Sequence, residues 1–115
     1  MGLGTWLARK GNVGGTARAV ANGWKVIIQH NPGISDEQIA ETYVGIRYGA
    51  TGEPHLAEQV LKGLKDHSIK INPLNLAWAI FSVENADESD TLLEHCLVWR
   101  EIMREEIEKL GVKAE

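Results

Sequence analysis

The side chains that could carry out catalysis are few: four histidines, one cysteine and sixteen acidic residues in a chain of 115. Proton transfer by a histidine and an acid would require both side chains on one helical face, and only His55 and Glu58, three residues apart, have that spacing. The other His–acid pairs are adjacent in the sequence and point in different directions. A surface ion pair explains His55 and Glu58 more simply, so the sequence favours a non-enzymatic protein.

Metal-binding patterns are missing from the sequence, which contains no CxxC, HExxH or Glu-x-x-His. His95 and Cys96 follow each other on an expected helix, where neighbours point about 100° apart. Cys96 belongs to the apolar stripe of that helix, so it is better explained as a small core residue than as a nucleophile. We therefore expect no metal and no cofactor.

One glycine-rich stretch has the character of an anion site. Residues 11–16, GNVGGT, precede an expected helix, and the exposed amides of a helix N-terminus attract anions. The candidate residues are Arg9, Lys10, Gly14, Gly15, Thr16 and Arg18. The string matches neither the P-loop nor the dinucleotide-binding pattern, so a flexible glycine hinge or a closely packed helix start explains it better than a nucleotide site.

The charge is distributed unevenly along the chain. Residues 1–35 carry four bases and no acid, whereas residues 36–115 carry all the acids. The net charge of −4 argues against a nucleic-acid-binding protein. The asymmetry predicts either that the basic segment is neutralised by the acidic remainder or that it forms a basic surface.

The apolar periodicity predicts an all-α, single-domain bundle of four or five helices. The clearest is a long C-terminal helix at about 90–110, whose stripe is Leu92, Cys96, Trp99, Met103, Ile107 and Leu110. Further helices are expected at residues 16–30, 36–48, 54–67 and 74–83. The last of these carries no charge, so we expect it at the centre of the core, with Trp78 and Phe81 contributing most.

Helix ends are marked by local signals. Ser35 and Gln38 have the spacing of a capping box, and Asn72 is followed by a proline suited to a first helical turn. Gly111 is placed for a left-handed C-cap. Residues 24–29 leave an alternative, because they alternate in polarity and could pair as a strand with residues 68–72; we expect a helix.

Several features indicate association. Gly15, Ala19 and Gly23 fall every fourth residue and leave a flat flank for another helix, and Val98 and Ile102 lie outside the main stripe of the C-terminal helix. The predicted interface comprises Trp6, Leu7, Gly15, Ala19, Gly23, Trp24, Val98 and Ile102. We therefore expect a helical interaction or assembly module, either a homo-oligomer or a small subunit of a complex.

Two alternatives remain: peripheral binding to an anionic membrane through the basic N-terminal segment, and binding of a small anion near residues 11–16. We divide the chain into a glycine-rich segment, residues 1–15, that can dock, and a helical domain, residues 16–115. The single cysteine, the absence of a signal-peptide pattern and the absence of a long apolar run predict a cytoplasmic protein. The sequence identifies no partner, ligand or pathway.

Overall fold

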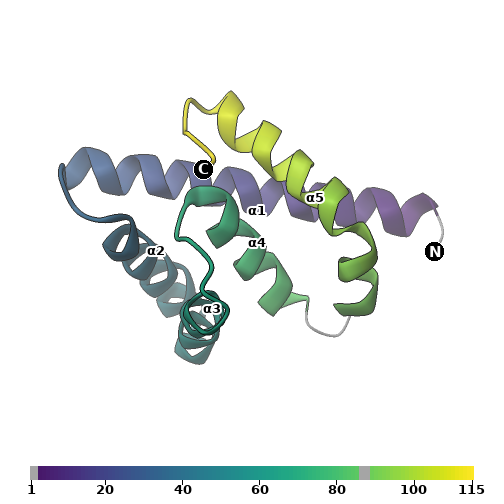
Figure 1. Cartoon of the computed structure of the whole chain (residues 1–115), viewed down its shortest axis with the longest axis horizontal. Helices are drawn as coiled ribbons and strands as arrows, with labels where there is room; N and C mark the ends of the chain where they lie inside the picture. Colours follow the sequence, from purple (N-terminus) through teal and green to yellow (C-terminus); the bar gives the residue numbers. More distant parts are fainter. Residues whose placement is uncertain (1–2, 86–88) are drawn as a thin grey trace.

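In a computed structural model the chain folds into a bundle of helices (Figure 1). The structure describes the backbone of residues 3–85 and 89–115 and the side chains of residues 10–85 and 97–115. The helices are α1 (Leu3–His30), α2 (Asp36–Thr51), α3 (Pro54–Asp66), α4 (Pro73–Glu84) and α5 (Ser89–Lys109). No strand occurs in those described ranges, which confirms the predicted all-α fold. The extended alternative for residues 24–29 is wrong, because these residues form the last turns of α1.

Helix α1 sets the length of the molecule. Its 28 residues, at about 1.5 Å each, span about 42 Å, close to the longest dimension of 44 Å. We expected this helix to begin near Thr16, but it begins at Leu3, so residues 11–16 lie in its interior. The glycines in this stretch have poor helix propensity, and packing against α5 and α4 stabilises the helix there. The buried face follows the three-four spacing of the apolar residues in the sequence: Val13, Ala17, Val20, Trp24 and Ile27.

Helix α4 lies at the centre, in contact with α1, α3 and α5 (Figure 1). Its buried residues include Leu74, Leu76, Ile80 and Phe81, all 1% exposed or less, as expected for a helix without charge in its middle. Trp78 differs from the prediction, since it is only partly buried. It lies on the side of α4 that faces the groove beside α3.

The three helix-end signals predicted at Ser35, Asn72 and Gly111 are confirmed. The Ser35 hydroxyl accepts a hydrogen bond from the Gln38 amide at 3.2 Å, and the Ser35 amide donates to the Gln38 side chain at 3.1 Å. The Asn72 side chain accepts from the Asn75 amide at 2.8 Å at the start of α4. Gly111 has a φ of 77°, the left-handed conformation that ends α5.

The segment after α5 folds back onto the bundle. The Leu74 amide at the start of α4 donates to the Ala114 carbonyl at 3.0 Å, and Ala114 is 2% exposed. The Lys25 ammonium on α1 donates to the Leu110 carbonyl at 3.2 Å. Three segments that are distant in the sequence therefore meet at this end of the molecule.

Candidate functional site

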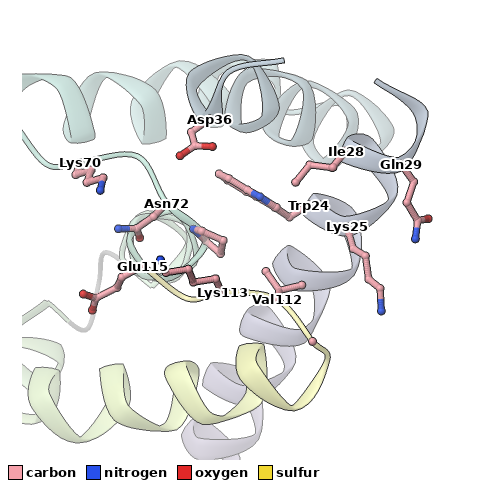
Figure 2. A pocket seen from close by; sticks show the side chains of 12 residues that line it. Trp24, Lys25, Ile28, Gln29, Asp36, Lys70, Asn72, Val112, Lys113 and Glu115 are labelled. Atoms are coloured by element: carbon pink, nitrogen blue, oxygen red, sulfur yellow. The ribbon is translucent and has the colours of Figure 1, made fainter. Parts of the chain in front are cut away.

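The meeting point of these segments encloses a pocket of about 370 Å³ (Figure 2). It lies between the last turns of α1, the start of α2, the connection before α4 and the segment after α5. The volume is within the range of about 300–1,000 Å³ that is usual for small-ligand sites. Its lining residues include the apolar Trp24, Ile28, Pro73 and Val112, and the charged Lys25, Asp36, Lys70, Lys113 and Glu115.

Local sequence signals place each wall of the pocket. The three-four spacing of α1 turns Trp24 inward, where it is 5% exposed, and leaves Lys25 on the rim. Asn72 caps α4, and Gly111 turns the chain so that Val112 and the residues after it return across the opening. The sequence predicted each of these local features but not that they would meet.

The pocket carries more positive than negative charge. Three of its residues are lysines, and Lys70 and Lys113 have no ion pair among the side chains that the structure describes. The Glu115 carboxylate is paired with the Arg104 guanidinium at 2.5 Å, so its charge is already offset. Asp36 is the remaining acid of the lining.

A buried polar side chain also lines the pocket. Asn72 is 5% exposed, and its Oδ1 atom is occupied by the Asn75 amide. The other half of the side chain, Nδ2, is a hydrogen-bond donor. Buried amides normally use both halves, so this donor is suited to an acceptor that enters the pocket.

A second polar cluster joins α2 to α4. Arg47 donates to the two Glu84 carboxylate oxygens at 2.9 and 3.0 Å and to the Tyr43 hydroxyl at 3.1 Å. The Tyr48 hydroxyl donates to Glu84 at 2.5 Å. Every charge in the cluster has a partner, which indicates a structural role. No sequence pattern predicts this cluster, because Glu84 is 36 residues or more from both of its partners.

The pKa values of this cluster follow from burial and the shared carboxylate. Burial, followed by the hydrogen bond to Glu84, raises the pKa of the Tyr48 hydroxyl above its ordinary value. Burial, the largest single cause, lowers the pKa of Arg47, but the hydrogen bonds to Glu84 and Tyr43 and the charges of these two groups together outweigh it and raise that pKa. Both groups therefore keep their protons more firmly than they would in an unfolded chain.

The predicted anion site does not lie at a helix N-terminus. Gly14 and Gly15 lie inside α1, where their amides belong to the hydrogen bonds of the helix, so the premise of a helix starting at Thr16 is wrong. Arg18 forms an ion pair with Glu106 of α5 at 3.1 Å. The Arg9 side chain lies outside the described residues. Binding of an anion by this set stays a prediction.

The predicted interface is divided by the structure. Trp24 is buried within its own chain, and the flank at Gly23 is covered by the Tyr43 ring. Val98 is 50% exposed and Ile102 is partly buried. Gly15 and Ala19 are half-buried, whereas the side chains of Trp6 and Leu7 lie outside the described residues. Self-association through these residues stays a prediction, and its exposed part is on α5.

The sequence did not single out Leu97 as exposed, although it is 80% exposed beside Val98. Both residues face away from the stripe formed by the buried Trp99, Met103 and Ile107. The signal was present, because Leu97 falls outside the three-four spacing of that stripe.

A metal-ligand cluster and a membrane-spanning helix are both absent from the described part of the chain. No three His, Cys, Asp or Glu side chains are grouped as metal ligands would be, and no helix has the length and apolar character needed to cross a membrane. Comparisons of the chain with protein-family models, with curated proteins and with solved structures found no significant match.

Proposed function

We propose that this chain is a cytoplasmic, non-enzymatic assembly module that self-associates through the outer face of α5. The observation that supports the proposal is the exposure of two adjacent large apolar residues, Leu97 at 80% and Val98 at 50%. Water contact at these side chains is unfavourable by about 25 cal/mol per Å² of apolar surface, and a second copy would remove it. In a two-fold dimer both copies use the same face, so each of these residues buries apolar surface twice in the interface.

The size of the apolar patch formed by Leu97 and Val98 limits the expected affinity of the dimer. Two exposed side chains in each copy cover much less than the roughly 800 Å² per partner of a standard interface. We therefore expect a weak dimer, with a dissociation constant on the order of 10–100 μM or above. Partly buried Ile102 borders the patch and can extend the contact.

Sedimentation velocity over a wide concentration range tests the proposal. The wild-type chain is expected to shift from monomer to dimer as its concentration rises, whereas Leu97→Glu stays monomeric, because burying an unpaired carboxylate opposes association. Ile46→Glu is the matched control, since Ile46 on α2 is 64% exposed and lies on another helix. A wild-type monomer at every concentration, or equal loss of the dimer in both variants, contradicts the proposal.

The membrane alternative has a narrower basis on α1. Val26 and Ile28 follow Lys25 in the sequence and are 50% and 42% exposed. Co-sedimentation with vesicles of neutral or anionic lipid separates this alternative from self-association. Binding that rises with anionic lipid and falls with salt would support it.

A further inference from the structure

We propose that the pocket of Figure 2 binds a small organic anion, namely a phosphate or carboxylate group attached to a flat, largely apolar body. This inference is independent of self-association, because the pocket and the exposed face of α5 share no residue. It also differs from the anion site expected from residues 11–16, none of which line this pocket.

The first argument is the origin of the positive charge. Lys25 belongs to α1, Lys70 to the connection between α3 and α4, and Lys113 to the segment after α5. All three line one pocket although they come from three separate parts of the chain, and in Figure 2 the Lys25 side chain points outward from its rim. Like charges brought together by folding oppose the compact state, and a bound anion would relieve that repulsion.

The second argument is that acids of the pocket do not cancel this charge. Arg104 holds the Glu115 carboxylate, so Glu115 offers little to the lysines. Asp36 is in the first turn of α2, where a carboxylate is stabilised by the helix dipole. The balance of the lining is therefore positive, and an entering anion meets Lys70 and Lys113 beside the Asp36 carboxylate, whereas the Lys25 ammonium is bonded to the Leu110 carbonyl at the rim.

The third argument is the apolar wall, which gives the ligand its body. Trp24 projects from α1 toward Asp36 in Figure 2, and Ile28 lies beside it. Pro73 and Val112 complete the apolar lining. A ligand with an apolar body would cover the exposed part of this wall, whereas a bare inorganic ion would leave it in contact with water.

The amides at the start of α4 are not the anion ligands. The Leu74 amide is bonded to the Ala114 carbonyl, and the Asn75 amide is bonded to the Asn72 side chain. The Lys25 ammonium is bonded to the Leu110 carbonyl, so the donors left for a ligand are the ammonium groups of Lys70 and Lys113 and Nδ2 of Asn72. Recognition would depend on flexible point charges, which select for charge and shape more than for one precise oxygen geometry.

Titration of the labelled protein with phenyl phosphate, followed by amide and indole NMR shifts, tests the proposal. We expect saturable shifts that centre on Trp24, Asn72 and Lys113, with a dissociation constant on the order of 0.1–1 mM. Inorganic phosphate should bind more weakly because it leaves the apolar wall unused, and neutral phenol should bind more weakly because it lacks the charge. Benzoate tests whether a carboxylate replaces the phosphate.

Charge reversal provides the matched comparison. Lys113→Glu should weaken binding of phenyl phosphate about fivefold or more, whereas Lys65→Glu, the same change at an exposed lysine of α3 outside this pocket, should leave it nearly unchanged. Equal weakening in both variants would mean unspecific attraction and overturn the proposal. The absence of shifts at the pocket with phenyl phosphate and with benzoate at about 10 mM would overturn it as well.

Discussion

The ring of Tyr43 on α2 rests on Gly23 of α1, so closely that a methyl group added at position 23 would overlap the ring atoms Cδ1 and Cε1. This contact sets how near α2 approaches α1. The small-residue flank of α1, which the sequence suggested for a partner chain, is therefore occupied at this point by the chain itself. A glycine is needed here for space and not for an unusual backbone conformation, since it lies inside a helix.

Gly23→Ala should destabilise the fold. The added methyl group forces the Tyr43 ring to move, and such overpacking costs about 1–3 kcal/mol, which exceeds the gain of up to about 1 kcal/mol from the better helix propensity of alanine. We expect a net loss of up to about 2 kcal/mol in the free energy of unfolding, measured by urea denaturation.

Gly45→Ala is the control for that experiment. Gly45 lies within α2, and a methyl group there would meet no atom within 4 Å. Only the better helix propensity of alanine then acts, so the free energy of unfolding of this variant should rise by about 0.5–1 kcal/mol. If both variants gain stability equally, the close contact of Gly23 with Tyr43 is contradicted.

Features that depend on neighbours in the sequence were predictable. The capping box at Ser35, the C-cap at Gly111 and the buried spacing from Val13 to Trp24 each involve residues of one helix or one turn. Their signals need no knowledge of the tertiary fold. The predicted N-terminal end of α1 was wrong. The glycines have poor helix propensity, and tertiary packing stabilises the helix despite them.

Features that depend on how helices are rotated and brought together were not predictable. Ile46 continues the three-four spacing of Ile39 and Tyr43, which favours a core position, but it is 64% exposed. The buried face of α2 continues instead through Val44 and Tyr48, which turns it away from Ile46. The pocket was missed for the same reason: its lysines gather only after three separate segments have packed.

The rotation of α2 predicts opposite outcomes for two neighbouring apolar positions. Ile46→Gln should change the free energy of unfolding by less than about 0.5 kcal/mol, because the side chain is already in water. Val44→Ala should cost about 1–3 kcal/mol, because Val44 is 1% exposed and its loss leaves a cavity. Thermal or urea unfolding measures both, and a larger loss at Ile46 than at Val44 would show that α2 is rotated differently.

Tyr48→Phe should lower stability at neutral pH. The hydroxyl donates to the Glu84 carboxylate, and hydrogen bonds to charged groups contribute about 1.5–3 kcal/mol. Part of this contribution is retained because Arg47 still neutralises Glu84. We therefore expect the free energy of unfolding, measured with urea, to fall by about 1.5 kcal/mol. An unchanged midpoint of unfolding would contradict the buried hydrogen bond.

The same tyrosine predicts a loss of stability in alkali. Its pKa is raised in the folded chain, so the native state keeps a proton that the unfolded chain releases above about pH 10. The stabilising contribution is therefore complete below pH 10 and declines as the pH rises toward the folded pKa. The difference in unfolding free energy between wild type and Tyr48→Phe should shrink above pH 10, and a difference that stays constant would contradict this assignment.

The ion pair between Arg18 and Glu106 links the basic α1 to the acidic α5 and has the opposite pH dependence. The hydrogen bond from Arg18 lowers the pKa of Glu106 below its ordinary value near 4.5, with a smaller contribution from Lys109. Its stabilising effect is thus present above about pH 4.5 and is lost as the pH falls through the folded pKa. Because half of the Arg18 side chain is exposed, solvent screening keeps the effect on stability below about 1 kcal/mol.

Arg18→Met should therefore raise the pKa of Glu106 toward its ordinary value while changing the stability at neutral pH only slightly. NMR titration of the Glu106 carboxylate measures the pKa directly. Lys109→Met serves as the control, because its longer contact of 3.4 Å with Glu106 predicts a smaller rise than removal of the 3.1 Å contact from Arg18. An equal or larger rise in the Lys109 variant would mean that neutralisation within α5, and not its contact with α1, sets the charge of Glu106.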